Sequence, residues 1–204
     1  MSQVTASELH TIDNDPSTLA IAQGVKLSDA QRKHVAVVLD LFQAKGTMAK
    51  LDDNFTENAV YEDLFASAKN REEVAGQLLH LPTICQSART LAYEVNSCSP
   101  TTTTDGTGTQ LDANEILVRF KHVFEFKLPL PRGGREVEVN TTLVIFSSEE
   151  TGKIVRLQDR PDEDIPDNAV LAWIRRMNAV GVPKVVGIPK DEKADAEKVM
   201  SQQR

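Results

Sequence analysis

Three segments in the second half of the chain alternate apolar and polar residues with a period of two. They cover residues 115–126, 136–147 and 153–160, and the turn-forming sequences PLPRGG and SEETG separate them. Such alternation is typical of strands that bury one face, and short loops of this kind favour antiparallel neighbours. A further extended segment begins at Arg89 and is expected to end near Pro100, before the flexible connection TTTTDGTGTQ. The sequence therefore predicts a mostly antiparallel sheet.

Helical signals dominate the first half of the chain. Ser28 and Gly46 bracket a segment with apolar residues at helical spacing, which predicts a helix over 29–45 with an N-cap and a glycine stop. A short helix over 48–55, a short strand over 59–63 and a helix over 71–81 opened by Asn70 are expected to follow. Asp167 is a candidate cap for a last helix over 168–180. The fold class expected is α+β.

The length of 204 residues suits one domain with short tails. We expect residues 1–26 to be partly disordered, although the apolar residues 19–22 could form a short helix or dock on the body. The domain is expected over 27–182, and 183–204 is expected to be a C-terminal extension that ends in a solvated, charged tail.

The charge and the rare residues restrict the function classes. A formal net charge of −7 argues against general binding of nucleic acid or of an anionic membrane surface. No apolar run spans a bilayer and no secretion signal is recognisable, so we expect a soluble protein of the cytoplasm. The two cysteines and four histidines form no metal-binding spacing. We expect neither a metal nor another cofactor.

Two motifs resemble a known family. The sequence FTENAVYEDLFA, residues 55–66, resembles a signature of the nuclear transport factor 2-like superfamily, which includes ketosteroid isomerases, SnoaL-like polyketide cyclases, scytalone dehydratase and limonene epoxide hydrolase. GKIVRLQDRPDED, residues 152–164, resembles the family's last strand. The resemblance covers roughly residues 28–165. It implies a cone-shaped curved sheet packed against about three N-terminal helices, with an additional C-terminal helix and an apolar pocket into which the catalytic groups project.

The resemblance also implies two candidate acids. Asp63 matches the proton-shuttling aspartate of the ketosteroid isomerases, and a carboxylate held in an apolar pocket gains a pKa suited to general-base work. The alternative is that Asp63 anchors a nearby loop. Asp159 stands where the epoxide hydrolases carry an inward acid, and its alternative is a salt bridge with Arg156 or Arg160.

His122 is a candidate from its position alone. It shares one face of its strand with Phe120 and Phe124, so the imidazole points with the apolar set and needs a partner. It could serve as acid, base or hydrogen-bond donor. The alternative is a core histidine bonded to a main-chain carbonyl or a buried tyrosine. Tyr61, Phe120, Phe124 and Trp173 are candidate ligand-binding residues, with ordinary packing as their alternative.

The chain also departs from the family's patterns. Leu39 stands where ketosteroid isomerases carry the tyrosine that stabilises the enolate, and that helix contains no tyrosine. Limonene epoxide hydrolases use an Arg-x-Asp arrangement on a middle strand, whereas here Lys121 follows Arg119. Neither of these two catalytic arrangements is therefore complete.

Two functions stay open. The first is a cofactor-independent lyase, isomerase or cyclase that acts on a small hydrophobic oxygenated molecule, with His122, Asp63 and Asp159 as acid–base residues. The second is a non-catalytic ligand-binding or dimerisation module. Val144 and Phe146 make the end of their strand apolar on both faces, which suits a homodimer formed through the sheet.

Overall fold

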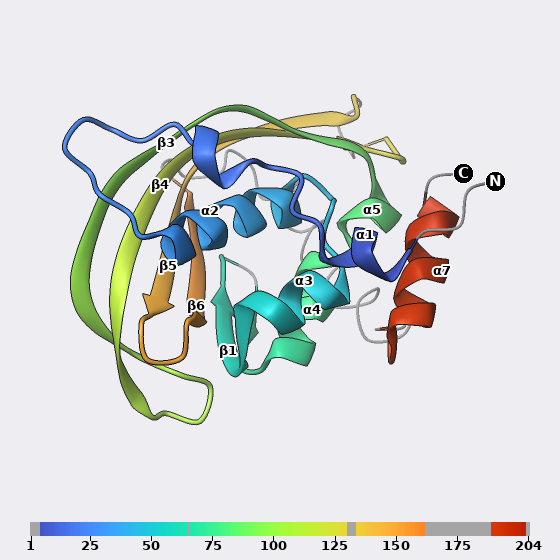
Figure 1. Ribbon diagram of the computed structural model, residues 1–204. Helices are drawn as coiled ribbons and strands as arrows, with labels where there is room; N and C mark the ends of the chain where they lie inside the picture. The colour runs from blue at the N-terminus through green and yellow to red at the C-terminus, as the bar shows by residue number, and fades with distance from the viewer. Residues whose placement is uncertain (1–4, 65, 130–133, 162–188, 203–204) are drawn as a thin grey trace.

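A curved sheet wraps around the longest helix, α2, and the remaining α-helices gather at one end of the molecule (Figure 1). The computed structural model describes residues 5–64, 66–129, 134–161 and 189–202. The sheet has six strands in the order β2-β1-β6-β5-β4-β3. The strands are β1 (Phe55–Glu62), β2 (Ser67–Ala68), β3 (Cys85–Thr104), β4 (Gln110–Phe126), β5 (Glu136–Ser148) and β6 (Lys153–Pro161). All neighbours are antiparallel except β1 and β6, which are parallel.

The helices are short apart from α2. They are α1 (Ala6–His10), the 3-10 turn η1 (Pro16–Thr18), α2 (Asp29–Phe42), α3 (Met48–Asn54), α4 (Arg71–Leu78), α5 (Leu81–Ile84) and α7 (Glu192–Gln202). None of these helices is both long and apolar enough to cross a membrane. The expected α+β class, with helices against a curved and mostly antiparallel sheet, is confirmed.

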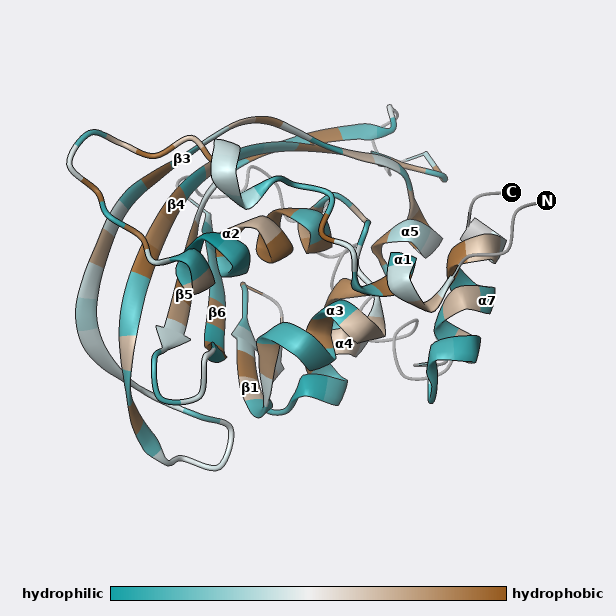
Figure 2. Ribbon diagram, viewed as in Figure 1, coloured by the Kyte–Doolittle hydropathy of each residue, from teal (hydrophilic) through white to brown (hydrophobic). Residues whose placement is uncertain are grey.

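α2 fills the concave face of the sheet. Ser28 and Gln31 form a capping box at its start, as the N-cap signal predicted. Its apolar side chains share one cluster with inward residues of β4, β5 and β6, including Ile116, Leu143 and Leu157, each 0% exposed. In Figure 2 hydrophobic colour marks the middle of α2 and alternates along β3 and β4. Burial on this scale is the main stabilising contribution to such a domain.

The end of α2 differs from the prediction. The helix stops at Phe42 rather than near Gly46, and the chain turns at Ala44, whose φ is 60°. A left-handed alanine is strained, so the turn is held by the bonds around it, among them the Lys45 amide to the Asp40 carbonyl at 2.9 Å. The turn brings residues 43–47 to the open end of the sheet.

The β3–β4 hairpin is longer than predicted. β3 runs through Pro100 to Thr104, because the threonine run pairs with the start of β4 instead of forming a flexible connection. Asp105 closes the turn by accepting the amides of Thr107 and Thr109. At Gly106 an added Cβ would lie 1.6 Å from a main-chain oxygen of Lys69, so only glycine fits where the tip meets the β1–β2 region.

Three irregularities in the β3–β4 register bend this hairpin. They lie between Cys85 and Ser87, between Thr90 and Ala92, and between Val95 and Ser97. Bulges of this kind increase the local twist and bend the strand that carries them. The curvature of the sheet therefore comes in large part from β3.

The side chains that suggested a homodimer are buried within a single chain. Val144 and Phe146 are 0% and 7% exposed and form a small cluster with Ala113 and Leu117, separate from the main core. Val144 and Phe146 therefore do not form an exposed apolar surface that a second copy of the chain could cover. The dimer itself stays a prediction.

Residues 19–22 and the helix α7 both lie against the domain. Main-chain bonds of 2.9 Å join Ala20 and Ala22 to Val95 of β3, which is the docked alternative for residues 19–22. At the other end α7 packs against α1 and α3, and Asp195 accepts the Ala49 amide at 3.1 Å. The expectation of a solvated tail is thus wrong for α7. The predicted helix over 168–180, with Trp173, lies outside the described residues.

Candidate functional site

The His122 ring lies in the concave wall between two phenylalanines. Its ring centroid is 4.9 Å from that of Phe120 and 4.5 Å from that of Phe124, and the ring is 0% exposed. Phe42 of α2 meets Phe120 edge-on at 5.5 Å. The period-two pattern of β4 placed these side chains correctly on one face. The faces of the imidazole therefore stand against aromatic rings.

A short chain of hydrogen bonds fixes the polar edge of His122. The Gln43 amide donates to the Thr90 hydroxyl at 3.0 Å, and Thr90 Oγ1 lies 3.3 Å from His122 Nδ1. Because the hydroxyl receives the Gln43 hydrogen, its own hydrogen is free for Nδ1, and when the hydroxyl donates there the ring proton lies on Nε2. Nε2 has no hydrogen-bond partner among the described residues.

Burial keeps His122 neutral. It lowers the pKa of His122 to about 4; the charge of Arg89 also lowers it, and the Phe42 carbonyl acts in the opposite direction. The threonine hydroxyl is the partner of Nδ1, and the Phe42 carbonyl also acts on the ring, so the alternative of a core histidine stays open. A neutral ring with Nε2–H is suited to donate a hydrogen bond rather than to carry a charge.

Asp63 and Asp159 approach each other around the hydroxyl of Tyr61. The Tyr61 hydroxyl donates to Asp63 at 3.0 Å, and the ring is 3% exposed. Burial raises the pKa of Tyr61 well above its usual range, and the charges of Asp63 and Asp159 raise it further. β1 and β6 are neighbours in the sheet, with Tyr61 opposite Leu157, which explains why the two acids meet there.

Both acids also make structural bonds. Asp63 accepts the Ala66 amide at 2.6 Å, the loop anchor that its alternative role required. Asp159 accepts the hydroxyl of Thr141 on β5. Arg156, a proposed salt-bridge partner of Asp159, pairs with Glu62 at 2.8 Å instead.

His122 does not join the two acids. His122 lies opposite Val139 in the sheet, whereas Asp159 lies opposite Leu143, one strand further across. The two positions are therefore about 13 Å apart along the strands and about 10 Å apart across them. The wall brings together Tyr61, Asp63 and Asp159, and it leaves His122 with Phe120 and Phe124.

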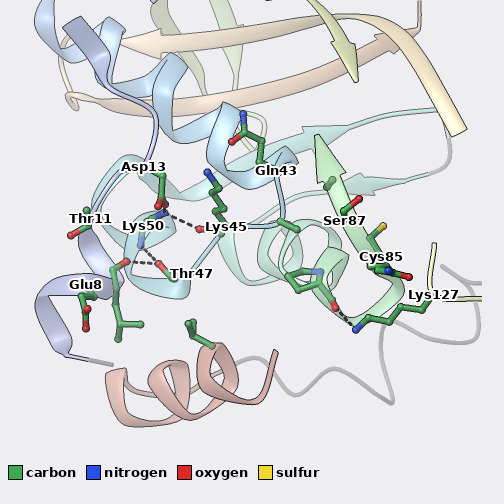
Figure 3. Close-up of a pocket in the computed structure, with 17 residues that line it drawn as sticks. Glu8, Thr11, Asp13, Gln43, Lys45, Thr47, Lys50, Cys85, Ser87 and Lys127 are labelled. Atoms are coloured by element: carbon green, nitrogen blue, oxygen red, sulfur yellow. Dashed lines mark hydrogen bonds and ion pairs between the residues drawn. The ribbon is translucent and has the colours of Figure 1, made fainter. Parts of the chain in front are cut away.

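A cavity that the sequence did not indicate opens at the end of the sheet. It measures ≈ 530 Å³, and we call it the mouth pocket (Figure 3). Its walls come from the N-terminal segment, the α2–α3 turn, the start of β3, the residue after β4, and α7. Its lining residues are Glu8, Leu9, Thr11, Asp13, Gln43, Ala44, Lys45, Gly46, Thr47, Lys50, Pro82, Cys85, Gln86, Ser87, Ala88, Lys127 and Val199. Of the residues predicted as catalytic or ligand-binding, those that the structure describes are not among them.

A buried ion-pair network supports one side of the mouth pocket. The Lys50 ammonium donates to Asp40 at 2.7 Å, to Asp13 at 2.8 Å and to the Lys45 carbonyl at 2.8 Å. Figure 3 shows Lys50 between Asp13 and the turn that carries Lys45. The Lys50 side chain is 2% exposed and that of Asp40 is 0%. The network holds the N-terminal segment against α2, so the pocket depends on that segment.

Gln43 links the two regions, since it lines the mouth pocket and also donates to Thr90 beside His122. Burial raises the pKa of Cys85, which lines the pocket, to about 12, so its thiol stays protonated and is a poor nucleophile near neutral pH. Across the part of the chain that the structure describes, no three His, Cys, Asp or Glu side chains are grouped as metal ligands.

Sequence comparison finds no matching family model and no matching curated protein. The architecture decides the fold: a curved sheet, mostly antiparallel, wraps a capped N-terminal helix, and further helices stand at its open end. This is the arrangement that the resemblance to the nuclear transport factor 2-like superfamily implies.

Solved structures that the chain is similar to carry related names. One is an NTF2-like protein of unknown function from Exiguobacterium sp. 255-15, at 16% identity over 64% of this chain and 99% of that one, with a TM-score of 0.44. Another is an LEH-like epoxide hydrolase from M. tuberculosis, at 16% identity, 64% and 76% coverage and a TM-score of 0.42.

A third is a protein with a ketosteroid isomerase-like fold from Catenulispora acidiphila DSM 44928, solved with trimethylamine, at 14% identity, 68% and 89% coverage and a TM-score of 0.43. A nuclear transport factor 2-like fold does not fix an activity, so function has to be argued from the sites.

Proposed function

We propose that this protein binds a small organic molecule with an apolar body and an oxygen function in the mouth pocket. The observation that carries this proposal is the pocket itself. Its volume of ≈ 530 Å³ falls within the range of about 300–1,000 Å³ that is usual for small-molecule sites.

The lining is divided between two kinds of surface. Leu9, Pro82, Ala88 and Val199 offer apolar contact area. Gln43 and Gln86 offer amide donors and acceptors, and hydroxyls stand between them. A molecule with one polar end and a ring-sized apolar end fits both kinds of surface. Its polar end can hydrogen-bond to the amides and hydroxyls of the lining, and its apolar end can contact the apolar side chains.

Filling the pocket tests the proposal. We expect 1-naphthaleneacetamide, a neutral probe with one polar end, to bind the wild type, and Ala88→Trp to weaken this binding by about ten-fold or more because the indole occupies the site. Ala92→Trp is the matched control, since Ala92 is exposed on the same strand and lies opposite Lys121. Calorimetric titration measures both. Equal affinity in the two variants, or no binding to the wild type, refutes the proposal.

A second candidate function is acid–base catalysis at the concave wall. The observation that favours it is the pair of carboxylates, Asp63 and Asp159, that both act on the buried Tyr61 hydroxyl. In such a pair one carboxylate takes a proton from carbon next to a carbonyl group, and a neighbouring hydroxyl or imidazole donates to the oxygen that becomes negative. His122 stands apart from this pair on the same wall, so in this proposal it donates to a different, more distant oxygen of the bound molecule, and Tyr61, Phe120, Phe124 and Trp173 supply apolar contacts.

Hydrogen exchange tests this chemistry without a known substrate. We expect the protein to speed the exchange of the methyl protons of 2-acetylnaphthalene for deuterium in D₂O, as followed by proton NMR. Asp63→Asn and Asp159→Asn should each slow the catalysed exchange by about a hundred-fold, since general-base catalysis contributes factors of about 10² to 10⁴. Exchange that is unchanged in both variants removes the assignment.

The remaining possibility from the sequence is a homodimer formed through the sheet. Its motivating side chains, Val144 and Phe146, are already buried within one chain. The homodimer stays a prediction, and sedimentation at micromolar protein concentration tests it, since a monomer there contradicts it.

A further inference from the structure

Two lysines of the mouth pocket stand without a carboxylate partner. Lys45 belongs to the α2–α3 turn and Lys127 follows β4, so their side chains reach the pocket from different elements (Figure 3). Among the described residues neither ammonium forms an ion pair. Lys127 donates one hydrogen to the Pro82 carbonyl at 2.7 Å, which leaves its positive charge without a countercharge.

The acidic groups of the same wall are already bonded. Glu8 accepts the amide and the hydroxyl of Thr5 at 2.6 and 2.9 Å, and these bonds lower the pKa of its carboxyl group. Asp13 is paired with Lys50 at 2.8 Å. Lys50 is in turn paired with Asp40 at 2.7 Å, so its charge is neutralised within the protein. Of the charged lining residues that the structure describes, Lys45 and Lys127 are the cationic groups without a carboxylate partner, and Glu8 is bonded to Thr5 rather than to a cation.

The lining of the mouth pocket also has an apolar part. Leu9, Ala44, Pro82 and Val199 contribute to it. A carboxylate held by an ammonium at the edge of such a surface keeps much of its hydration and gains a charge-assisted hydrogen bond. The apolar body of the same molecule gains the contact area.

We propose that the ligand of the mouth pocket is a small organic anion, namely a carboxylate on an apolar body, with Lys45 and Lys127 as the residues that select its charge. This inference rests on the proposed function, that the pocket binds a small molecule. The net charge of −7 works against anions at long range. Selection of an anion therefore depends on these two local charges.

Three probes that share one ring system and differ in charge test the inference. They are 1-naphthaleneacetate, 1-naphthaleneacetamide and 2-(1-naphthyl)ethylamine, each titrated calorimetrically into the full-length protein. We expect the acetate to bind about five-fold tighter than the amide, and the amine to bind weakest, because partly exposed charge pairs contribute modestly.

The variants Lys45→Met and Lys127→Met keep the apolar stems and remove the charges. Each should lower the preference for acetate over amide, and the double variant should abolish it while amide binding stays within about two-fold. Lys121→Met is the matched control. Its ammonium is paired with Glu138 at 2.8 Å and Lys121 does not line the pocket, so the preference should not change.

The outcomes separate this inference from the proposed function. Binding of acetate and amide with equal affinity, or a preference that survives the double variant, refutes the anion selection and leaves the pocket as a small-molecule site. Tighter binding of the amine also refutes it. If none of the three probes binds at millimolar concentration, both proposals are wrong.

Discussion

Replacing Lys50 by methionine is expected to lower the free energy of unfolding by about 3–5 kcal/mol, the usual cost of leaving a buried charge without its partner. The Asp40 carboxylate would remain 0% exposed, with the Lys50 ammonium at 2.7 Å removed. Asp40 would still accept the amides of Asp13 and Asn14 at 2.9 and 3.0 Å, but hydrogen bonds replace only part of a countercharge. Urea denaturation followed by circular dichroism measures the change.

A second substitution identifies the cause. Asp40→Asn in the Lys50→Met background removes the stranded charge and keeps an acceptor for the Asn14 amide, so it should restore part of the lost stability. Lys121→Met removes one partner of an exposed pair, whose side chains are 45% and 48% exposed, and should cost no more than about 1 kcal/mol. If Lys50→Met costs no more than Lys121→Met, the buried network does not hold the N-terminal segment in the way inferred.

Local signals predicted the elements of the fold well. The capping residues Ser28 and Asn70 stand where α2 and α4 begin, and the alternation in β4 gave both the strand and its buried face. The ends were harder to predict. Pro100 and the threonine run lie within β3 because they pair with the neighbouring strand β4. The local sequence of a segment does not show which strand it will pair with, so this extension could not be predicted.

The candidate sites show the same division between local and distant information. The sequence places the His122 side chain among phenylalanines, but Thr90 comes from another strand and Gln43 from the end of α2. The mouth pocket was missed because its wall includes residues 8–13, which carry no periodic pattern and are positioned by the Lys50 network. Lysine in an otherwise buried helical turn was the one local signal that could have pointed there.

Lowering the pH from about 7.5 to about 5 is expected to destabilise the protein through its buried histidines. Burial lowers the pKa of both His34 and His122 from 6.5 to about 4. Burial also lowers the pKa of His80, with the Asp63 charge acting in the opposite direction. The exposed His10 differs, since its bond to Asp53 raises its pKa. Three of the four histidines therefore favour the neutral form in the folded state.

The direction follows from proton binding in the two states. Between about pH 6.5 and pH 4 the unfolded chain binds protons at these histidines and the folded protein does not, so stability falls as the pH falls through this window. Because the pKa of each of His34 and His122 moves from 6.5 to about 4 on folding, each should lower the free energy of unfolding at about pH 5 by about 2 kcal/mol.

Single substitutions show how much of the loss of stability at low pH each histidine causes. His122→Phe keeps an aromatic ring between Phe120 and Phe124 and removes the Nε2 atom that lacks a partner, so the loss between about pH 7.5 and about pH 5 should shrink by about 2 kcal/mol. His34 bonds Ser147 and the Gly152 carbonyl at 2.9 and 3.2 Å, so His34→Gln should shrink the same loss but also lower stability at neutral pH. His10→Gln is the exposed control and should leave the loss at low pH in place. If stability is flat from pH 7.5 to 5, or if His122→Phe leaves the pH dependence unchanged, then His122 titrates near its ordinary pKa and is not enclosed as the geometry indicates.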